Sequence, residues 1–247
     1  GREVWVRDEG LLVRDRDGTL ICLQGYMLDI TERKRSDALT ESHARLLEFI
    51  ATGPRLPEVL DHLTRFVEDW SGDVLCSVLL LDRDGVHLRH AAAPGLPSTY
   101  TEAIDGLEIG PGVGSCGTAA FRRQSVTVTD IAADPLWRDY RDLALEAGLR
   151  ACWSTPIFAP DSTLLGTFAM YYREPRGPDD HDRRLVEVAT HAASIAIEHA
   201  RSEEALRASE ERYRDLFENA NEPIATVTLD DTITEVNAAF ERALGYT

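Results

Sequence analysis

The sequence predicts an α+β fold in which an antiparallel sheet of roughly five or six strands is flanked by helices. Short apolar runs of strand length recur along the chain, and two of them, at 74–82 and 86–93, are joined by a tight turn at Asp84-Gly85. Amphipathic helical patterns lie around these runs. Strands and helices do not alternate regularly, as they would in a fold built from βαβ units, so a doubly wound parallel sheet is not expected.

The first part of the chain is expected to contain a β-hairpin and two helices. Apolar residues alternate over residues 3–30, and a turn at Gly18 separates two strand-like stretches. The spacing of apolar residues then predicts a helix over 36–51, which Gly53-Pro54 ends. A second helix is expected over 56–70, because its apolar residues share one face.

After the paired strands at 74–82 and 86–93 comes a glycine-rich stretch at 110–120. Gly148 is expected to end one of the later helices, and the long helix that follows has no internal glycine or proline. The remaining elements are expected, in order, as a helix at 117–123, a strand at 125–130, a helix at 141–148, strands at 150–158 and 164–172, a helix at 178–217, and a strand–turn–strand–helix pattern over 223–247.

The composition disfavours several classes of partner. Asp and Glu number 43 against 26 Lys and Arg, which gives a formal net charge of −17. Such a chain repels phosphate backbones and anionic lipid surfaces, so we expect neither nucleic acid nor a membrane as its partner. The four cysteines show no CxxC spacing, which favours free thiols in a cytoplasmic protein. The chain begins Gly1-Arg2 without a methionine, and we expect it to be a segment of a longer protein.

The centre of the chain contains the stretches "VLCSVLLLDRDGVHLRHAAAPGLP", "GPGVGSCGTAAFRR", "VTVTDIAADPLWRDYRDLALEAGLRACWSTPI" and "LLGTFAMYY". Together these stretches resemble a GAF domain over residues of about 40–200. Towards its two ends the chain contains "GYMLDITERKR" and "EERYRDLFENANEPIATVTLDDTITEVNAAFERALGYT". On these stretches, residues 1–35 resemble the end of a PAS domain, and residues 210–247 resemble the beginning of another. The order PAS–GAF–PAS is typical of the sensory region of bacterial signalling proteins, including two-component histidine kinases and diguanylate cyclases.

The resemblance implies a regulatory segment with no catalytic residues of its own. No kinase or cyclase motif occurs in the chain, and the sequence requires no cofactor, so the identity of any ligand stays unknown. The implied segments are the C-terminal part of a PAS domain at 1–35, a GAF domain with an N-terminal linker helix at 36–200, a coiled-coil linker at 201–216, and the N-terminal part of a second PAS domain at 217–247.

The glycine-rich stretch "GPGVGSCGTAA" contains a formal GxGxxG with Cys116 inside it. A dinucleotide site needs these glycines directly after a parallel strand, which the preceding residues do not provide. We therefore expect the glycines to shape a loop before a helix. Cys116 is either a reactive thiol near the start of that helix or a small buried residue.

Two other functions remain as alternatives. Free-methionine-(R)-sulfoxide reductases are single GAF domains with a similar loop, but the segment that carries their catalytic cysteine has no cysteine here, and the position near Cys152 lacks their substrate-binding acid. A cyclic-nucleotide-binding GAF module is the other alternative, although the sequence has no arginine cluster. Residues 134–149 contain neither Cys nor His, which disfavours a covalent bilin. The seven histidines form no metal-ligand pattern, so no metal site is expected.

Aromatic side chains around the second half of the sheet suggest a small-molecule pocket, because aromatic residues with a few polar groups suit such cavities. The alternative is that these residues fill a core that binds nothing. The candidate pocket residues are Cys116, Trp137, Tyr140, Trp153, Phe168 and Met170.

The long helix carries a heptad-like stripe with 4-3-4-3 spacing. Residues 181–198 are expected to pack on their own domain, whereas the stretch beyond has no sheet to cover it. We therefore expect a parallel homodimer through this helix, with a weak seam suited to switching. The stripe consists of Val188, Ala192, Ile195, His199, Ser202, Leu206, Ser209, Tyr213 and Leu216.

Overall fold

The computed structural model describes residues 4–245, without the side chains of 35, 36, 38–43, 46 and 47. Its centre is a six-stranded sheet with the order β5-β4-β3-β8-β7-β6, in which every neighbouring pair is antiparallel. The predicted fold class is thereby confirmed. The strands are β3 (Val74–Leu81), β4 (His87–Ala92), β5 (Leu107–Glu108), β6 (Val126–Val128), β7 (Ala151–Phe158) and β8 (Leu164–Tyr172).

Strands β3 and β8 approach each other closely at the middle of the sheet. A Cβ added at Gly166 would lie 2.1 Å from the carbonyl oxygen of Leu79. That distance is far below van der Waals contact, so a glycine is required at this position, where the two neighbouring strands lie closest. β7 and β8 are buried on both faces, and this makes them the structural centre of the molecule.

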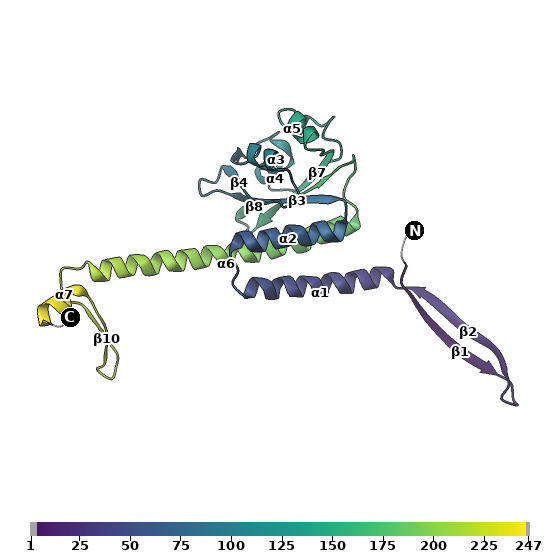
Figure 1. The fold of residues 1–247 in the computed structure, drawn as a ribbon, viewed down its shortest axis with the longest axis horizontal. Helices are drawn as coiled ribbons and strands as arrows, with labels where there is room; N and C mark the ends of the chain where they lie inside the picture. The colour runs from purple at the N-terminus through teal and green to yellow at the C-terminus, as the bar shows by residue number, and fades with distance from the viewer. Residues whose placement is uncertain (1–3, 246–247) are drawn as a thin grey trace.

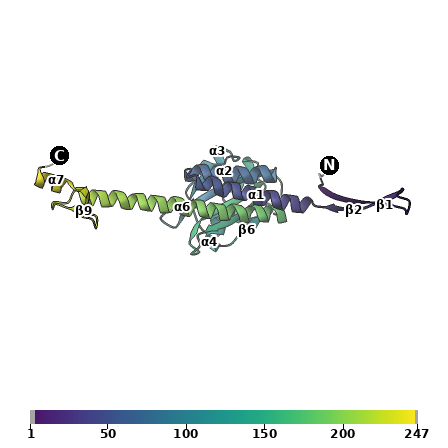
Figure 2. The same cartoon turned by 90° about the horizontal axis from the view of Figure 1, so that it is seen from below.

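Three helices cover one face of the sheet. α2 (Leu56–Ser71) and the first half of α6 (Asp180–Glu218) pack directly against the strands, and α1 (Thr31–Ala51) lies below them (Figure 1). Seen from below, the three helices run side by side (Figure 2). α1 begins at Thr31, five residues before the expected Ser36, because its charged first turns lie in solvent and need no apolar partner.

The opposite face carries shorter elements and the glycine-rich loop (Figure 1). α4 begins at Gly114, three residues before the expected start, since Gly112 and Gly114 both take positive φ and turn the chain into the helix earlier. The elements on this side are α3 (Ser98–Ala103), α4 (Gly114–Arg122), the 3-10 helix η1 (Pro135–Trp137) and α5 (Arg141–Glu146).

Two small β units lie at opposite ends of the molecule (Figure 1). The hairpin formed by β1 (Val6–Arg14) and β2 (Leu20–Asp29) precedes α1, and its large apolar side chains are exposed. After α6 come β9 (Ala225–Val227), β10 (Ile233–Val236) and α7 (Ala238–Leu244), in the strand–turn–strand–helix order that the sequence predicts.

Candidate functional site

A small cavity lies between the sheet and the elements α3, α4 and η1. Its walls include side chains of all three elements and of strands β3 and β8. About 20 Å³ is open to a water-sized molecule, which is room for about one such molecule. The walls are mostly apolar, and they include Leu79, Tyr100, Cys116, Trp137, Tyr140 and Tyr171.

Three of the six predicted pocket residues line this cavity, namely Cys116, Trp137 and Tyr140. The other three are Trp153, Phe168 and Met170, and they belong to the core on the opposite face of the sheet, against α2 and α6. That part of the prediction is wrong. Successive residues of a strand point to opposite faces, so the neighbours of cavity-facing residues in β7 and β8 necessarily face the helices. Trp153, Phe168 and Met170 are such helix-facing residues.

A buried hydrogen-bond network forms the floor of the cavity. The Tyr171 hydroxyl lies 3.3 Å from Ser77 Oγ and 3.7 Å from Cys116 Sγ. Trp137 Nε1 donates to Ser115 Oγ at 3.1 Å, and Ser115 Oγ donates to the Cys152 carbonyl oxygen at 3.4 Å. These bonds fix the start of α4 against the middle of the sheet.

Two cysteines in this network have opposite electrostatic environments. A hydrogen bond with the Cys152 thiol is the largest of the effects that together lower the pKa of Cys116 to about 7. Burial raises the pKa of Cys152 well above its usual range. Burial likewise raises the pKa of Tyr171, so its hydroxyl stays protonated as a donor. Cys116 is therefore the thiol of this pair that ionises near neutral pH.

The glycines of the GxGxxG stretch serve the backbone. Gly112 and Gly114 have φ values of 96° and 53°. A Cβ at Gly117 would lie 2.7 Å from the Val113 side chain. The strand before the loop, β5, pairs antiparallel with β4, so the stretch lacks the parallel-strand setting of a dinucleotide fingerprint.

A polar joint connects the sheet to the start of α6. Asp182 is buried and accepts hydrogen bonds from the Tyr172 hydroxyl at 3.2 Å and from Arg176 Nη2 at 2.9 Å. It also forms a capping box with Asp179, in which each side chain accepts from the other residue's backbone N–H. The last residue of β8 thus holds the first turn of α6.

Comparison with known families adds to this geometry. A sequence profile of the GAF domain family matches residues 54–198, more than half of the chain. The chain belongs to the GAF domain family. A PAS domain profile matches residues 211–247, which begin inside α6. No comparison tests the predicted PAS fragment at 1–35 or the other segment boundaries, which stay predictions.

One curated relative is the "Methyl sulfide methyltransferase-associated sensor" of Methanosarcina acetivorans. It is 37% identical over 247 residues, a match that covers all of this chain and 25% of the relative. The chain therefore spans about a quarter of the length of the curated relative that it matches.

Solved structures share the fold of the GAF domain. A GAF sensor protein from Burkholderia vietnamiensis has a TM-score of 0.52 and 24% identity, with 66% of this chain and 98% of that chain covered. The GAF domain of a phosphoenolpyruvate-protein phosphotransferase from Coxiella burnetii has a TM-score of 0.55 and 21% identity over 67% and 96%. The free methionine-R-sulfoxide reductase of Neisseria meningitidis has a TM-score of 0.53 and 18% identity over 65% and 88%.

Helix α6 divides into two parts where it leaves the GAF domain. Its buried residues within the domain run from Asp182 to Ile197, which confirms the predicted packing of residues 181–198. In the expected seam, Ala192 is buried and Val188 packs against the domain core. The other seam residues are on the surface: Ile195, His199, Ser202, Leu206, Ser209, Tyr213 and Leu216.

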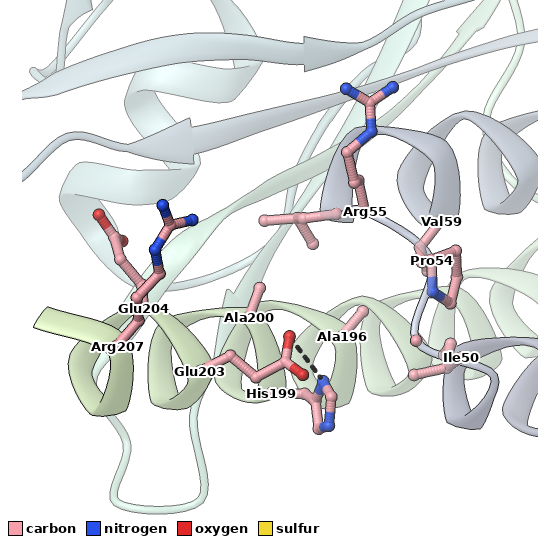
Figure 3. Close-up of a pocket in the computed structure, with 12 residues that line it drawn as sticks. Ile50, Pro54, Arg55, Val59, Ala196, His199, Ala200, Glu203, Glu204 and Arg207 are labelled. Atoms are coloured by element: carbon pink, nitrogen blue, oxygen red, sulfur yellow. Dashed lines mark ion pairs between the residues drawn. The ribbon is translucent and has the colours of Figure 1, made fainter. Parts of the chain in front are cut away.

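A groove marks the exit point of α6 (Figure 3). One side of it is formed by the end of α1 and the α1–α2 turn, with Ile50 and Pro54. The other side is the middle of α6, with Ala196 and His199. Within it His199 Nδ1 lies 3.7 Å from Glu203 Oε2, one helical turn further on. The groove is open, with about 340 Å³ accessible to water.

Two further findings concern residues 4–245. Among these residues, no group of three or more His, Cys, Asp and Glu side chains is placed to hold a metal ion. His87 instead pairs with Asp84 of the β3–β4 turn, with 2.5 Å between Nδ1 and Oδ2. Across the same stretch, the helices are too short or too polar to span a bilayer.

Proposed function

We propose that this chain is a non-catalytic sensory and relay segment of a signal-transduction protein. In this proposal the GAF cavity receives the input, and α6 carries the output by pairing in parallel with α6 of a second copy. The division of α6 is the observation that supports it. One half is buried in the domain, and the other half lies mostly on the surface and carries an exposed apolar stripe that includes Leu206, Tyr213 and Leu216.

The contacts of β7 and β8 supply a route between the two ends of the relay. Tyr171 faces the cavity, and the next residue, Tyr172, bonds to Asp182 at the start of α6. In β7, Cys152 faces the same side as Tyr171, and Trp153 lies under Arg183 of α6, with the guanidinium 5.9 Å from the ring centre. A change at the cavity floor therefore acts on α6 through directly bonded neighbours.

We place the parent protein among cytoplasmic two-component sensors, with its kinase or cyclase output outside this chain. The sensor name of the Methanosarcina acetivorans relative supports a sensory role. The PAS profile that begins within α6 also supports it, because it puts a second sensory module directly on the output helix.

Light scattering and cysteine cross-linking test the dimer. A parallel two-fold pair sets each stripe residue beside its own copy, so Leu206→Cys and Leu216→Cys, made in a Cys22→Ser background, should each form a disulfide-linked dimer. Ala208→Cys is the matched control, because a residue two positions from Leu206 lies about 200° around the helix. A monomer at roughly 50 μM would refute the dimer. A dimer that links through only one stripe position would refute its parallel arrangement.

The reductase alternative has its own test. The room for about one water molecule beside Cys116 is smaller than free methionine sulfoxide, which disfavours that substrate. We expect no turnover of methionine sulfoxide with a thiol reductant. Robust turnover that Cys116→Ser abolishes would make this chain an enzyme and overturn the regulatory assignment.

A further inference from the structure

Cys116 and Cys152 meet beneath α4, although 36 positions separate them in the sequence. Both are buried in the same core cluster, on the cavity side of the sheet. The residue before Cys116 donates a hydrogen bond to the Cys152 carbonyl oxygen. Cys152 is also the direct strand partner of Tyr171, whose hydroxyl contacts Cys116 Sγ at 3.7 Å. Cys116 in α4 and Cys152 in β7 thus lie on the two sides of the interface between this helix and the sheet.

The surroundings of Cys116 favour its thiolate. The hydroxyls of Ser154 and Thr167 are fully buried on this face of the sheet and have no hydrogen-bond partner. A negative sulfur at Cys116 offers both an acceptor. They add to the larger effect of the Cys152 thiol in lowering the pKa of Cys116. Two unpartnered buried donors are costly in a neutral core, so their presence beside a thiol is an observation in its own right.

Access to Cys116 is limited by size. Its side chain lines the cavity together with Trp137 and Tyr140, and 6% of the residue is exposed. Because hydrogen peroxide is the smallest hydroperoxide, a space for about one water-sized molecule disfavours it least and disfavours bulky oxidants most. Cys152 is fully buried and does not line the cavity.

We propose that Cys116 and Cys152 form an oxidation site that hydrogen peroxide converts to a disulfide. The Cys116 thiolate attacks one peroxide oxygen, the O–O bond breaks, and an S–O bond forms. The leaving hydroxide takes up the thiol proton and departs as water. Cys152 sulfur then attacks the resulting sulfenic sulfur, the S–O bond breaks, and the hydroxyl leaves as a second water with the Cys152 proton. Two thiols and one peroxide thus become one disulfide and two waters.

The oxidation deepens the proposed function by naming its input, and only its effect on α6 rests on that function. A disulfide would tie α4 directly to β7, one residue away from Trp153 and its contact with Arg183 of α6. Chemical oxidation and helix pairing are separate measurements, so each can fail alone.

Mass spectrometry of the purified chain tests the site. After removal of reductant, about one equivalent of hydrogen peroxide should produce an intramolecular disulfide that joins the Cys116 and Cys152 peptides. Cys152→Ser should stop at a sulfenic acid on Cys116 that a dimedone reagent traps, and Cys116→Ser should give neither product. Cys76→Ser is the matched control, since Cys76 is buried on the other face of the sheet, and it should oxidise like the natural chain.

Four results would overturn the proposal. The first is a disulfide that uses Cys22 or Cys76 in place of the pair. The second is that the unsubstituted chain, treated with peroxide, keeps both thiols reduced while its circular dichroism shows a folded protein. The third is a sulfenic acid on Cys116 that persists although Cys152 is present. The fourth is cumene hydroperoxide reacting as fast as hydrogen peroxide, because the narrow cavity predicts a rate at least about tenfold lower for the bulky reagent.

Light scattering of the oxidised and reduced chains separates this proposal from the proposed function. A disulfide that forms in a chain that is monomeric in both states supports the oxidation site and refutes the dimeric relay. A dimer that persists in a chain whose Cys116 and Cys152 resist peroxide refutes the site and leaves the relay standing.

Discussion

Replacing Asp182 with alanine should loosen α6 from the sheet. The change removes the acceptor of two side-chain hydrogen bonds, from Tyr172 and Arg176, and one half of the capping box with Asp179. The lost cap costs about 1 kcal/mol. The buried Tyr172 hydroxyl loses its partner and Arg176 keeps only its longer ion pair with Asp179, which together cost about 2 kcal/mol more, since Arg176 is one-third exposed and regains water. The expected loss is therefore about 3 kcal/mol.

Thermal and urea unfolding, followed by circular dichroism, measure this loss. For a domain of this size, 1 kcal/mol shifts the melting temperature by about 2–4 °C, so Asp182→Ala should lower it by about 6–12 °C. Asp180→Ala is the matched control, because Asp180 lies in the same helical turn but is exposed. It should cost less than about 1 kcal/mol, the usual size of a helix-dipole effect. Equal losses in the two variants would refute the anchoring role of Asp182.

Three further outcomes follow from the geometry. Because the pKa of Cys116 is lowered to about 7, its thiolate ultraviolet absorbance, measured as the difference from Cys116→Ser, should rise through pH 7 and level off above about pH 8, and at pH 7 its thiolate fraction should exceed that of an ordinary thiol about 15-fold. Gly166→Ala should cost at least about 3 kcal/mol in urea unfolding, since the added Cβ lies 2.1 Å from the Leu79 carbonyl oxygen. Arg83→Ala should change the free energy of unfolding by less than about 1 kcal/mol, because the Arg83–Glu204 ion pair is exposed.

Much of the fold follows from local sequence, but the assignment of residues to the two sheet faces does not. Strands β7 and β8 are buried on both sides and read as continuous apolar runs, without the alternation that marks an inner face. The sequence pattern therefore places Trp153, Phe168 and Met170 at the cavity, whereas in the structure they face the helices. One correctly placed residue assigns its neighbours at a period of two, but the register shift near Leu165 breaks that period in β8, because Leu165 and Phe168 face the same core.

The cavity floor was beyond sequence reasoning for a different reason. Ser77, Tyr100 and Tyr171 come from three separate elements, and their meeting depends on sheet order and helix placement. The same holds for the contact between Cys116 and Cys152. By contrast, the end of domain packing near residue 198 of α6 was predictable, because a helix that outlasts its sheet has nothing left to cover.

The alternation of β7 and β8 also explains how a small change at the cavity could reach the far end of α6. Each strand presents one residue to the cavity and the next to α6, so the two faces cannot move independently in a close-packed interior. The part of α6 beyond the domain core, from Ala200 to Glu218, is about 28 Å long at 1.5 Å per residue. A tilt of about 5° at the exit from the domain therefore displaces its end by about 2–3 Å. In the dimer that we propose, packed helices would lie about 8–10 Å apart, so such a displacement is about a quarter of their spacing.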